Sequence, residues 1–447
     1  MAAAVGSQTR ILVGLVAGAA LGSLVNYLVA KNPELKPAVD WVLKYIMNPV
    51  GQIFINLLFL AIIPLVFASL AVGVTRLGGG ENVGRIGLKT IAYFIITTAC
   101  AAVIGLTLVN QFRPGDAVDD KLKNKLMDEY TRDHAEKDRK PANMGIETLI
   151  NVVPKNPLKS FVEKDMLSLI FTALLVGAAL TRIDPSQAKV LIDILEAVNA
   201  VTDCIIRVAM AVAPFGVFAL IFLTTAKFGT DLLLALAAFM GTVLGGLAIQ
   251  LFIVFPILVK VLGGMSPITF FVRSKAAMIT AFSTSSSSAT LPTAMKTAED
   301  ELGVPANVSR FVLPLSASMN HNGTALFEAV TAVFLCQVFG VDLTLQQEIV
   351  VLLLCVLTAT GMAGVPGGSL PLIGMVVASV TSQVPAAAIG IVIGVDRILD
   401  MCRTMVNVTG DLTTTLYVSR SERDKIAALT SEVSRPTSEV GTPPPAP

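Results

Sequence analysis

Residues 396–411 read DRILDMCRTMVNVTGD, a stretch in which charged side chains interrupt an apolar helix at regular intervals. The polar positions are spaced by 4, 3, 4 and 4 residues: Asp396, Asp400, Arg403, Asn407 and Asp411. At about 100° per residue, they share one helical face within an arc of roughly 80°. A buried charge in a membrane costs at least about 2.5 kcal/mol. This face therefore predicts a water-filled cavity, a bound ligand or a cluster that neutralises itself.

Arg403 and Asp400 indicate what such a ligand would carry. The planar guanidinium of Arg403 fits a carboxylate through two parallel hydrogen bonds. Asp400 lies nearly one turn away and suits an ammonium group. The two residues together predict a ligand with a carboxylate and an amine. The alternative is an Arg403–Asp400 ion pair without a ligand.

The composition predicts a polytopic membrane protein. Of 447 residues, 54% are apolar and 15% are charged, and the mean hydropathy is +0.74. A soluble protein of this length carries more charge. The net charge of +1 gives no electrostatic basis for nucleic-acid binding. The high hydropathy makes membrane lipid the expected surrounding. Apolar runs long enough to span a bilayer occur at about 11–30, 42–75, 86–112, 144–182, 190–227 and 230–263.

Beyond residue 263 the apolar pattern is broken twice in a similar way. Residues 266–296 are two short apolar stretches around a serine-rich run, and residues 344–382 are two around a Gly-Val-Pro-Gly-Gly-Ser run. Neither half of either unit is long enough to span, so each predicts a re-entrant helical hairpin. A helix with polar residues at its middle follows each unit, at 303–338 and 385–418. Paired broken segments of this kind indicate a transporter binding site.

The helix predicted at 303–338 contains Asn-His-Asn-Gly-Thr at 320–324. Gly323 weakens a helix at its middle and favours local unwinding. Asparagine side chains offer neutral oxygens, which suit Na⁺. His321 is either a proton site or, as we favour, a packed polar residue. Glu328, one turn beyond Thr324 in an apolar stretch, is either a proton carrier or a hydrogen-bonded neutral acid.

Lysine and arginine counts predict that both termini are cytoplasmic. The alternation of spans places the charged loop 113–142 outside, although it carries as many basic as acidic residues. Residues 430–447 are rich in Ser, Thr, Glu and Pro and predict a disordered tail. The compact length and short extracellular connections favour a prokaryotic inner membrane.

Four motifs together resemble the glutamate transporter family, the dicarboxylate/amino acid:cation symporters. They are SSSSATLP at 285–292, NHNGTAL at 320–326, GVPG at 364–367 and DMCRTMVNVTGD at 400–411. The resemblance runs over nearly the whole chain outside the tail. It implies an all-α fold with eight transmembrane helices, two re-entrant hairpins, inverted repeats and a homotrimer. It also implies an elevator mechanism, in which a transport domain moves against a fixed scaffold.

The implied domains divide the chain as follows. The scaffold comprises helices 1 and 2 at 1–85 and helices 4 and 5 at 143–228. The transport domain comprises helix 3 at 86–112, helix 6 at 229–263, hairpin 1 at 264–298, helix 7 at 300–340, unwound at NHNGT, hairpin 2 at 342–382 and helix 8 at 384–420.

The resemblance also implies residue roles. Arg403 would bind the side-chain carboxylate of the substrate and Asp400 its amino group. The α-carboxylate and the pocket wall would use Asn407, Thr404, Thr324, Ser286, Ser287, Ser288, Val365 and Gly367. Three Na⁺ sites would draw on Asp411, Asn407, Asn320 and Ser316, on Ser318, Ala359, Thr360 and Met362, and on Thr97, Thr98, Asn320 and Asn322. Hairpin 2 would gate the pocket through Gly364, Pro366 and Gly368.

This chain departs from the family pattern in the motif at 320–324, which usually reads Asn-Met-Asp-Gly-Thr. Asn322 replaces the acid, which removes a negative charge from the third cation site. His321 replaces the methionine. Glu328 matches the position that proton-coupled animal members use for proton transfer, so a proton is expected to replace one sodium ion. Arg397 lies one turn before the position where animal members place an additional arginine, and its role is left open.

The sequence thus predicts a symporter that imports glutamate or aspartate together with Na⁺, H⁺ or both. The same fold with a neutral amino acid or a C4-dicarboxylate is the first alternative, and an anion channel or membrane enzyme is the second. Arg403 argues against neutral substrates, and a plain dicarboxylate does not need Asp400. The chain has no nucleophile–base arrangement, HExxH, CxxC or nucleotide loop, so we expect neither an enzyme nor an organic cofactor.

Overall fold

The computed structural model describes residues 2–75, 80–118, 123, 153–158, 166–362, 364 and 367–433. Within these ranges the chain is helical, and no β-strand occurs. The first half contains α1 (Ala2–Lys31), η1 (Pro33–Leu35), α2 (Lys36–Val42), η2 (Leu43–Met47), α3 (Asn48–Thr75), α4 (Gly80–Phe112), η3 (Pro114–Ala117), α8 (Met166–Leu180) and α9 (Pro185–Phe228). The second half contains α10 (Thr230–Ile249), η4 (Gln250–Val254), α11 (Phe255–Val261), α12 (Pro267–Thr284), α13 (Ser287–Lys296), η5 (Thr297–Glu301), α14 (Ala306–Met319), α15 (Asn322–Val338), α16 (Leu345–Gly361), α17 (Leu370–Val380), η6 (Ala386–Ile389) and α18 (Gly390–Val433).

Four of the described helical segments are long and apolar enough to cross a membrane: Thr9–Lys31, Ile86–Ala117, Pro185–Lys227 and Leu233–Val261. They coincide with four of the predicted spans. Large apolar side chains such as Val16, Leu88 and Phe252 lie exposed on them, as expected for surfaces that face lipid. The chain is therefore a helical multi-pass membrane protein. The prediction of eight spans stays a prediction.

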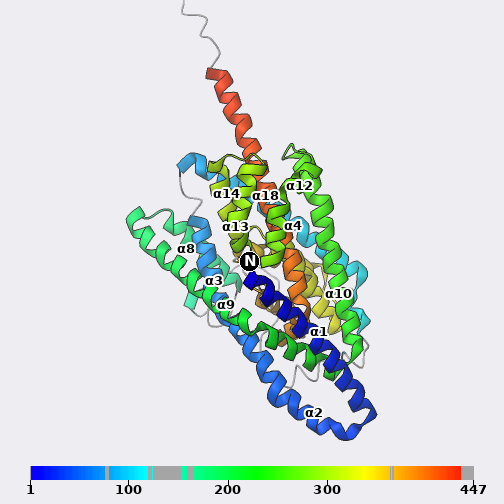
Figure 1. The fold of residues 1–447 in the computed structure, drawn as a ribbon. Coiled ribbons are helices and arrows are strands. Elements are labelled where there is room, and N and C mark those ends of the chain that lie inside the picture. The colour runs from blue at the N-terminus through cyan, green and yellow to red at the C-terminus, as the bar shows by residue number, and fades with distance from the viewer. Residues whose placement is uncertain are drawn as a thin grey trace, which may run out of the picture.

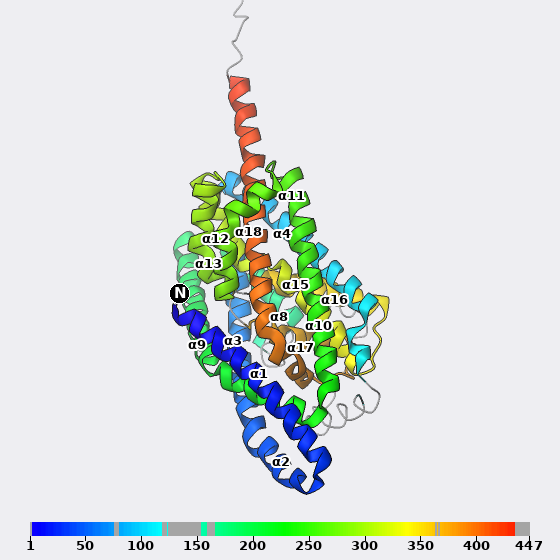
Figure 2. The ribbon, with the colours of Figure 1, turned by 45° about the vertical axis from the view of Figure 1, so that its right-hand side comes forward.

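The helices form two neighbouring groups (Figures 1 and 2). In the first group, α9 packs along α1 and α3, and α3 also contacts α8. In the second group, α4, α10, α12 to α16 and α18 pack on one another, with α15 between α4 and α18. Helix α18 also contacts α9 and so joins the groups. Its C-terminal end projects beyond the other helices in both figures and reaches Val433, so residues 430–433 of the predicted tail are helical.

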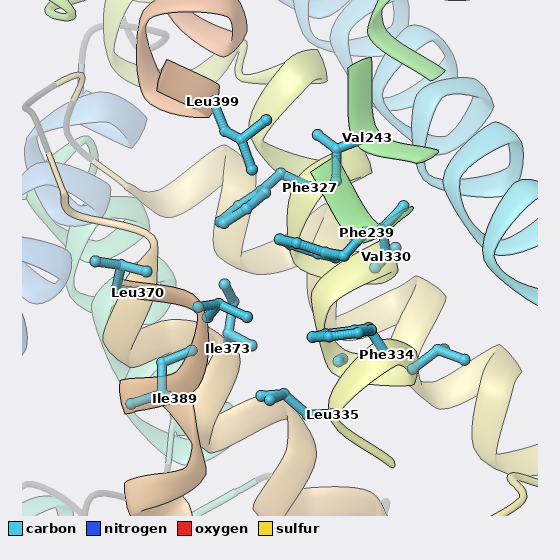
Figure 3. Packing of buried hydrophobic residues seen from close by; sticks show 14 of the residues in the cluster. Phe239, Val243, Phe327, Val330, Phe334, Leu335, Leu370, Ile373, Ile389 and Leu399 are labelled. Atoms are coloured by element: carbon cyan, nitrogen blue, oxygen red, sulfur yellow. The ribbon is translucent and has the colours of Figure 1, made fainter. Parts of the chain in front are cut away.

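Three phenylalanines hold α15 against α10 at the centre of the second group (Figure 3). The ring of Phe239 on α10 stacks on Phe334 with centroids 4.6 Å apart and lies 6.2 Å from Phe327. All three side chains are fully buried. Aromatic pairs at these separations add to the stability that burial provides. The cluster fixes the position of Phe327, whose ring forms part of the surroundings of Arg403.

Small residues bring α1 and α9 into close contact. Gly14, Gly18 and Gly22 recur every four residues and therefore lie on one face of α1. A Cβ at Gly18 would lie 2.7 Å from the carbonyl oxygen of Phe218 on α9. Small residues at this spacing allow helix backbones to approach closely in membranes.

Replacing Gly18 with alanine is expected to destabilise the α1–α9 contact by about 1–3 kcal/mol, because backbone must move to admit the new methyl group. The free energy of unfolding in an SDS titration measures the effect. Gly241→Ala on α10 is the matched control, since a Cβ there meets nothing within 4 Å. Alanine at that helical position should be neutral or slightly stabilising. Equal stability of the two variants would contradict the close-contact argument.

Three interruptions of the helices lie near one another around α18. Between α14 and α15, Asn320 and His321 leave the helical conformation. Between α12 and α13, Ser285 adopts a left-handed backbone with φ 51°. Between α16 and α17, Gly367 has φ 74°, a conformation that glycine adopts without strain. The two helix pairs and the interrupted helix occupy the segments predicted as hairpin 1, hairpin 2 and helix 7.

Candidate functional site

A cavity of about 240 Å³ lies where the three interruptions face α18. Its lining is mostly polar: Ser285, Ser287, His321, Thr324, Met362, Gly364, Gly368, Ser369, Asp400, Arg403, Thr404 and Asn407. These residues come from segments that are up to 122 positions apart in the sequence, from Ser285 to Asn407. The polar lining favours a small polar molecule over an apolar ligand.

Arg403 is the cation of this cavity and is only 2% exposed. Its Nη2 lies 2.7 Å from Oδ1 of Asp400, with a hydrogen bond, and 3.1 Å from Oδ1 of Asp396, without hydrogen-bond geometry. Its guanidinium carbon lies 3.9 Å from the centroid of the Phe327 ring, a cation–π contact. Its Nε and Nη1 have no hydrogen-bond partner within the described residues. Two buried donors of a fixed cation are thus available to an acceptor.

Asp400 lies between two guanidinium groups. Its Oδ1 accepts from Arg403, and its Oδ2 lies 3.5 Å from Nη1 of Arg397. Asp400 also borders a second cavity of about 340 Å³, together with Asp396 and Arg397. The opposite wall of that cavity is apolar and comes from α1, α3 and α9: Ile11, Phe54, Met210, Ala213 and Val217.

The tips of the two helix pairs meet beside the first cavity. The hydroxyl of Ser286 donates to the carbonyl oxygen of Gly364 at 2.8 Å, and the N–H of Ser288 approaches the same oxygen at 3.4 Å. A Cβ at Gly364 would lie 2.7 Å from Cβ of Ser287 and 2.8 Å from the carbonyl oxygen of Ala317. The close approach of the tips therefore requires glycine at this position.

Asn407 joins α18 to the start of α15. Its Oδ1 accepts from the N–H of Gly323 at 2.8 Å, and its Nδ2 donates to the hydroxyl of Thr324 at 3.1 Å. A Cβ at Gly323 would lie 2.8 Å from the carbonyl oxygen of Arg403. The absence of a side chain at Gly323 lets the two helices touch directly behind the guanidinium group.

Oxygen atoms gather on both sides of the break between α14 and α15. On one side, Nδ2 of Asn320 donates to Oδ1 of Asp411 at 2.9 Å, and the buried amide oxygen of Asn320 has no partner among the residues that the structure describes. On the other side, the hydroxyl of Thr98 donates to Oδ1 of Asn322 at 2.7 Å. The hydroxyl of Thr97 lies 3.3 Å from the same atom.

His321 bridges the break to α16. Its Nδ1 lies 2.9 Å from the carbonyl oxygen of Ala359, and its Nε2 is buried without a partner. A carbonyl oxygen only accepts, so Nδ1 carries the hydrogen of this bond. The imidazole therefore donates to the last turn of α16, where helix carbonyls lack intrahelical partners.

Glu328 is fully buried one turn beyond Thr324 on α15. The hydroxyl of Thr358 on α16 donates to its Oε2 at 2.6 Å, and its Oε1 has no partner. Ser316 and Ser318 donate their hydroxyls to carbonyl oxygens of their own helix.

The profile of the sodium:dicarboxylate symporter family matches residues 8–421 of the chain. The chain belongs to this family. It is 35% identical to a proton/sodium-glutamate symport protein of Bacillus subtilis, over 93% of both chains. It is 33% identical to a proton/glutamate-aspartate symporter of Escherichia coli, over 95% of both chains. It is also 32% identical to a C4-dicarboxylate transport protein of Bacillus subtilis, over 85% of this chain and 88% of the relative.

Membership of the sodium:dicarboxylate symporter family confirms the predicted family and places the chain among transporters rather than enzymes. The structure brings together most of the residues for which we predicted a role in substrate binding. Gly367 borders the second cavity rather than the first, and Ser286 contacts Gly364. Val365 and Pro366 lie outside the described residues.

The sequence gives no pocket role to Ser285, Ser369 or Arg397, and it places Asp396 on the polar face of the last helix without a specific role. Ser369 and Ser285 line the first cavity, and Asp396 and Arg397 border the second. Asp396 could be predicted as a site residue, because it shares the polar face of α18 with Asp400 and Arg403. Nothing in the sequence pattern assigned Ser369 to a site, since its place beside Arg403 depends on the tertiary fold.

Proposed function

We propose that this family member is a cation-coupled symporter that imports an acidic amino acid. The observation that carries the proposal is a buried arginine, Arg403, which lines a small polar cavity beside Asp400. Its Nε and Nη1 have no partner among the described residues. A cation with free donors next to an acid is complementary to a ligand that carries a carboxylate and an ammonium group. Relatives named for glutamate and aspartate symport support this substrate class.

In the proposed complex, Arg403 binds the side-chain carboxylate and Asp400 binds the ammonium group. The α-carboxylate lies near Asn407, Thr404 and the serine-rich tip between α12 and α13. Thr324 lines the pocket beside Asn407, with which it shares a hydrogen bond. Charge-assisted hydrogen bonds of this kind give both affinity and orientation.

Uptake into proteoliposomes with independently set Na⁺, H⁺ and K⁺ gradients tests the proposal. Labelled glutamate, aspartate, alanine and succinate are compared in one preparation. We expect cation-driven accumulation of glutamate or aspartate and little of the others. Preferential accumulation of succinate would assign the chain the activity named for its C4-dicarboxylate relative, and accumulation of alanine would exclude the proposed role of Arg403.

The architecture we propose has eight spans, two re-entrant hairpins formed by α12–α13 and α16–α17, and a homotrimer in the inner membrane with cytoplasmic termini. The group of α1, α3, α8 and α9 would form the scaffold, and the second group would form the moving transport domain. The closer packing of the helices within each group than between the groups supports this division. The contact between Ser286 and Gly364 supports a gate at the tip of hairpin 2, where Gly364 and Gly368 line the first cavity.

Glu328 is the proposed proton carrier of the symporter. If a proton on Glu328 accompanies the substrate, uptake by the wild-type protein falls as the pH rises. Glu328→Gln keeps the shape of the neutral acid at every pH, so its uptake should vary with pH much less than that of the wild type. The measurement is initial uptake at fixed Na⁺ between about pH 5 and pH 9.

Glu348→Gln is the control, because Glu348 also sits in a helix and accepts a hydrogen bond, from Asn110, but lies away from the cavity. Its pH profile should match the wild type. If Glu328→Gln also kept the wild-type profile, Glu328 would have no part in coupling.

A further inference from the structure

Three groups of oxygen atoms around the break between α14 and α15 are candidates for holding a cation. The first contains Asp411 and Asn320. The second consists of the carbonyls in the last turn of α16, including that of Ala359. The third contains Thr97, Thr98 and Asn322. The hydrogen bonds within each group show which of its oxygen atoms remain free to bind an ion.

The first group retains a negative charge and a free acceptor. Asp411 is 2% exposed, and only Oδ1 is engaged by Asn320. The amide oxygen of Asn320 is fully buried and has no hydrogen-bond partner in the described part of the chain. A buried carboxylate with a neighbouring uncommitted amide oxygen is a favourable place for a hard monovalent cation.

The second group already has a donor from the protein. The Nδ1–H of His321 points at the carbonyl oxygen of Ala359 over 2.9 Å. This hydrogen carries positive partial charge, so it repels a cation at the same carbonyl oxygen. His321 is 1% exposed, and its ring lies between the break and the last turn of α16.

The third group is neutral. Its central oxygen, Oδ1 of Asn322, accepts a hydrogen bond from the hydroxyl of Thr98 and lies 3.3 Å from the hydroxyl of Thr97. Whichever way the Asn322 amide is turned, it contributes no charge, and its nitrogen carries two N–H bonds. A cation entering this group would lose its hydration shell without meeting a carboxylate, at a cost that neutral oxygens repay only in part.

We propose that His321 and Asn322 close two of the three candidate cation sites with the protein's own hydrogen bonds, so that the Asp411 group alone takes Na⁺. His321 then holds α16 to the break in the way a bound ion would. This inference rests on the proposed symport function, but it concerns ion binding, which is measurable without a substrate.

The experiment measures Na⁺ binding to the purified protein in detergent without substrate. The readout is the thermal unfolding midpoint as Na⁺ replaces choline at constant total salt. In parallel, the Na⁺ dependence of glutamate binding gives a Hill coefficient, whose upper limit is the number of coupled sites. The proteins compared are the wild type, His321→Met, Asn322→Asp and, as a surface control, Asn32→Asp, which changes an exposed asparagine in the connection after α1.

For the wild type we expect the midpoint to rise with Na⁺ and the Hill coefficient to be about 1. Asn322→Asp supplies the missing charge and should lower the Na⁺ concentration for half-maximal stabilisation at least about tenfold, with a Hill coefficient closer to 2. His321→Met removes the N–H from the carbonyl of Ala359 and should also steepen the Na⁺ dependence. Asn32→Asp should behave as the wild type does.

Several results would overturn the inference. A wild-type Hill coefficient of about 2 or more would show that a second site is open. A wild-type midpoint that does not respond to Na⁺ would exclude the site at Asp411. A Na⁺ dependence that both His321→Met and Asn322→Asp leave unchanged would show that neither residue closes a site. Failure to accumulate acidic amino acids in proteoliposomes would instead contradict the proposed function, while the thermal measurement would still decide the number of ion sites.

Discussion

Arg403→Cys is expected to reduce uptake of glutamate and aspartate by at least about 100-fold. The substitution removes the only described guanidinium of the first cavity, with the two N–H groups that have no protein partner. A hydrogen bond to a charged group contributes about 1.5–3 kcal/mol, and a bidentate contact has two of them. Initial uptake into proteoliposomes is the measurement, and small neutral amino acids should be tested as substrates of the variant.

The loss of Arg403 also leaves Asp396 and Asp400 without their nearest cation, which is a separate cause of failure. Arg403→Lys retains the charge but loses the planar fork, so it should fold and still lose about tenfold or more in apparent affinity. Arg310→Cys is the matched control, because Arg310 is largely exposed and contacts only Glu299 among the ion pairs described. Unchanged glutamate and aspartate uptake by Arg403→Cys would remove Arg403 from the binding site.

Asp411→Asn is expected to give the second large effect, a loss of Na⁺-dependent substrate binding. The variant keeps the size of the side chain and removes the charge that would face the ion. Two unit charges at about 4 Å interact by on the order of 4 kcal/mol at an effective dielectric constant of 20. The amide oxygen of the asparagine retains part of this interaction energy with the ion. The Na⁺ concentration for half-maximal binding should therefore rise at least about tenfold. Binding of labelled glutamate across a Na⁺ titration is the measurement.

Asp342→Asn serves as the control for this variant, because Asp342 is exposed and pairs with Arg113 outside the cavities described. Its Na⁺ titration should superimpose on that of the wild type. The double variant Asp411→Asn with Asn322→Asp moves the carboxylate from the first oxygen group to the third, so it tests whether the third group can take the ion instead. If Asp411→Asn alone bound substrate with wild-type Na⁺ dependence, Asp411 would not be a cation ligand.

Local patterns in the sequence predicted the class of the protein and the chemistry it carries. Apolar runs predicted membrane helices at four segments that the structure shows as long apolar helices. The spacing of Asp396, Asp400 and Arg403 followed from the helical repeat, and the structure places them in mutual contact. Their assignment to a substrate remains a prediction.

Such local patterns do not predict contacts between segments that are far apart in the sequence. A period of 3.6 residues fixes which side chains share a face, but it does not determine what lies opposite that face. The family resemblance placed both tips at one pocket, but no local pattern indicated that Ser286 hydrogen-bonds Gly364, 78 residues later, or that His321 meets Ala359. Those contacts depend on how α13 and α16 pack against α14 and α15 on either side of the break.

The amino-acid sequence by itself determined that the chain is a helical membrane transporter with a charged face on its last helix, because hydropathy and helical periodicity are local properties. Only the tertiary structure decided which atoms of that face stay free. Arg403 keeps two unpartnered donors, whereas the amide oxygen of Asn322 and the carbonyl oxygen of Ala359 already accept protein hydrogen bonds. The physical reason is that a hydrogen bond needs two groups within about 3 Å of each other, and packing between distant helices sets that distance.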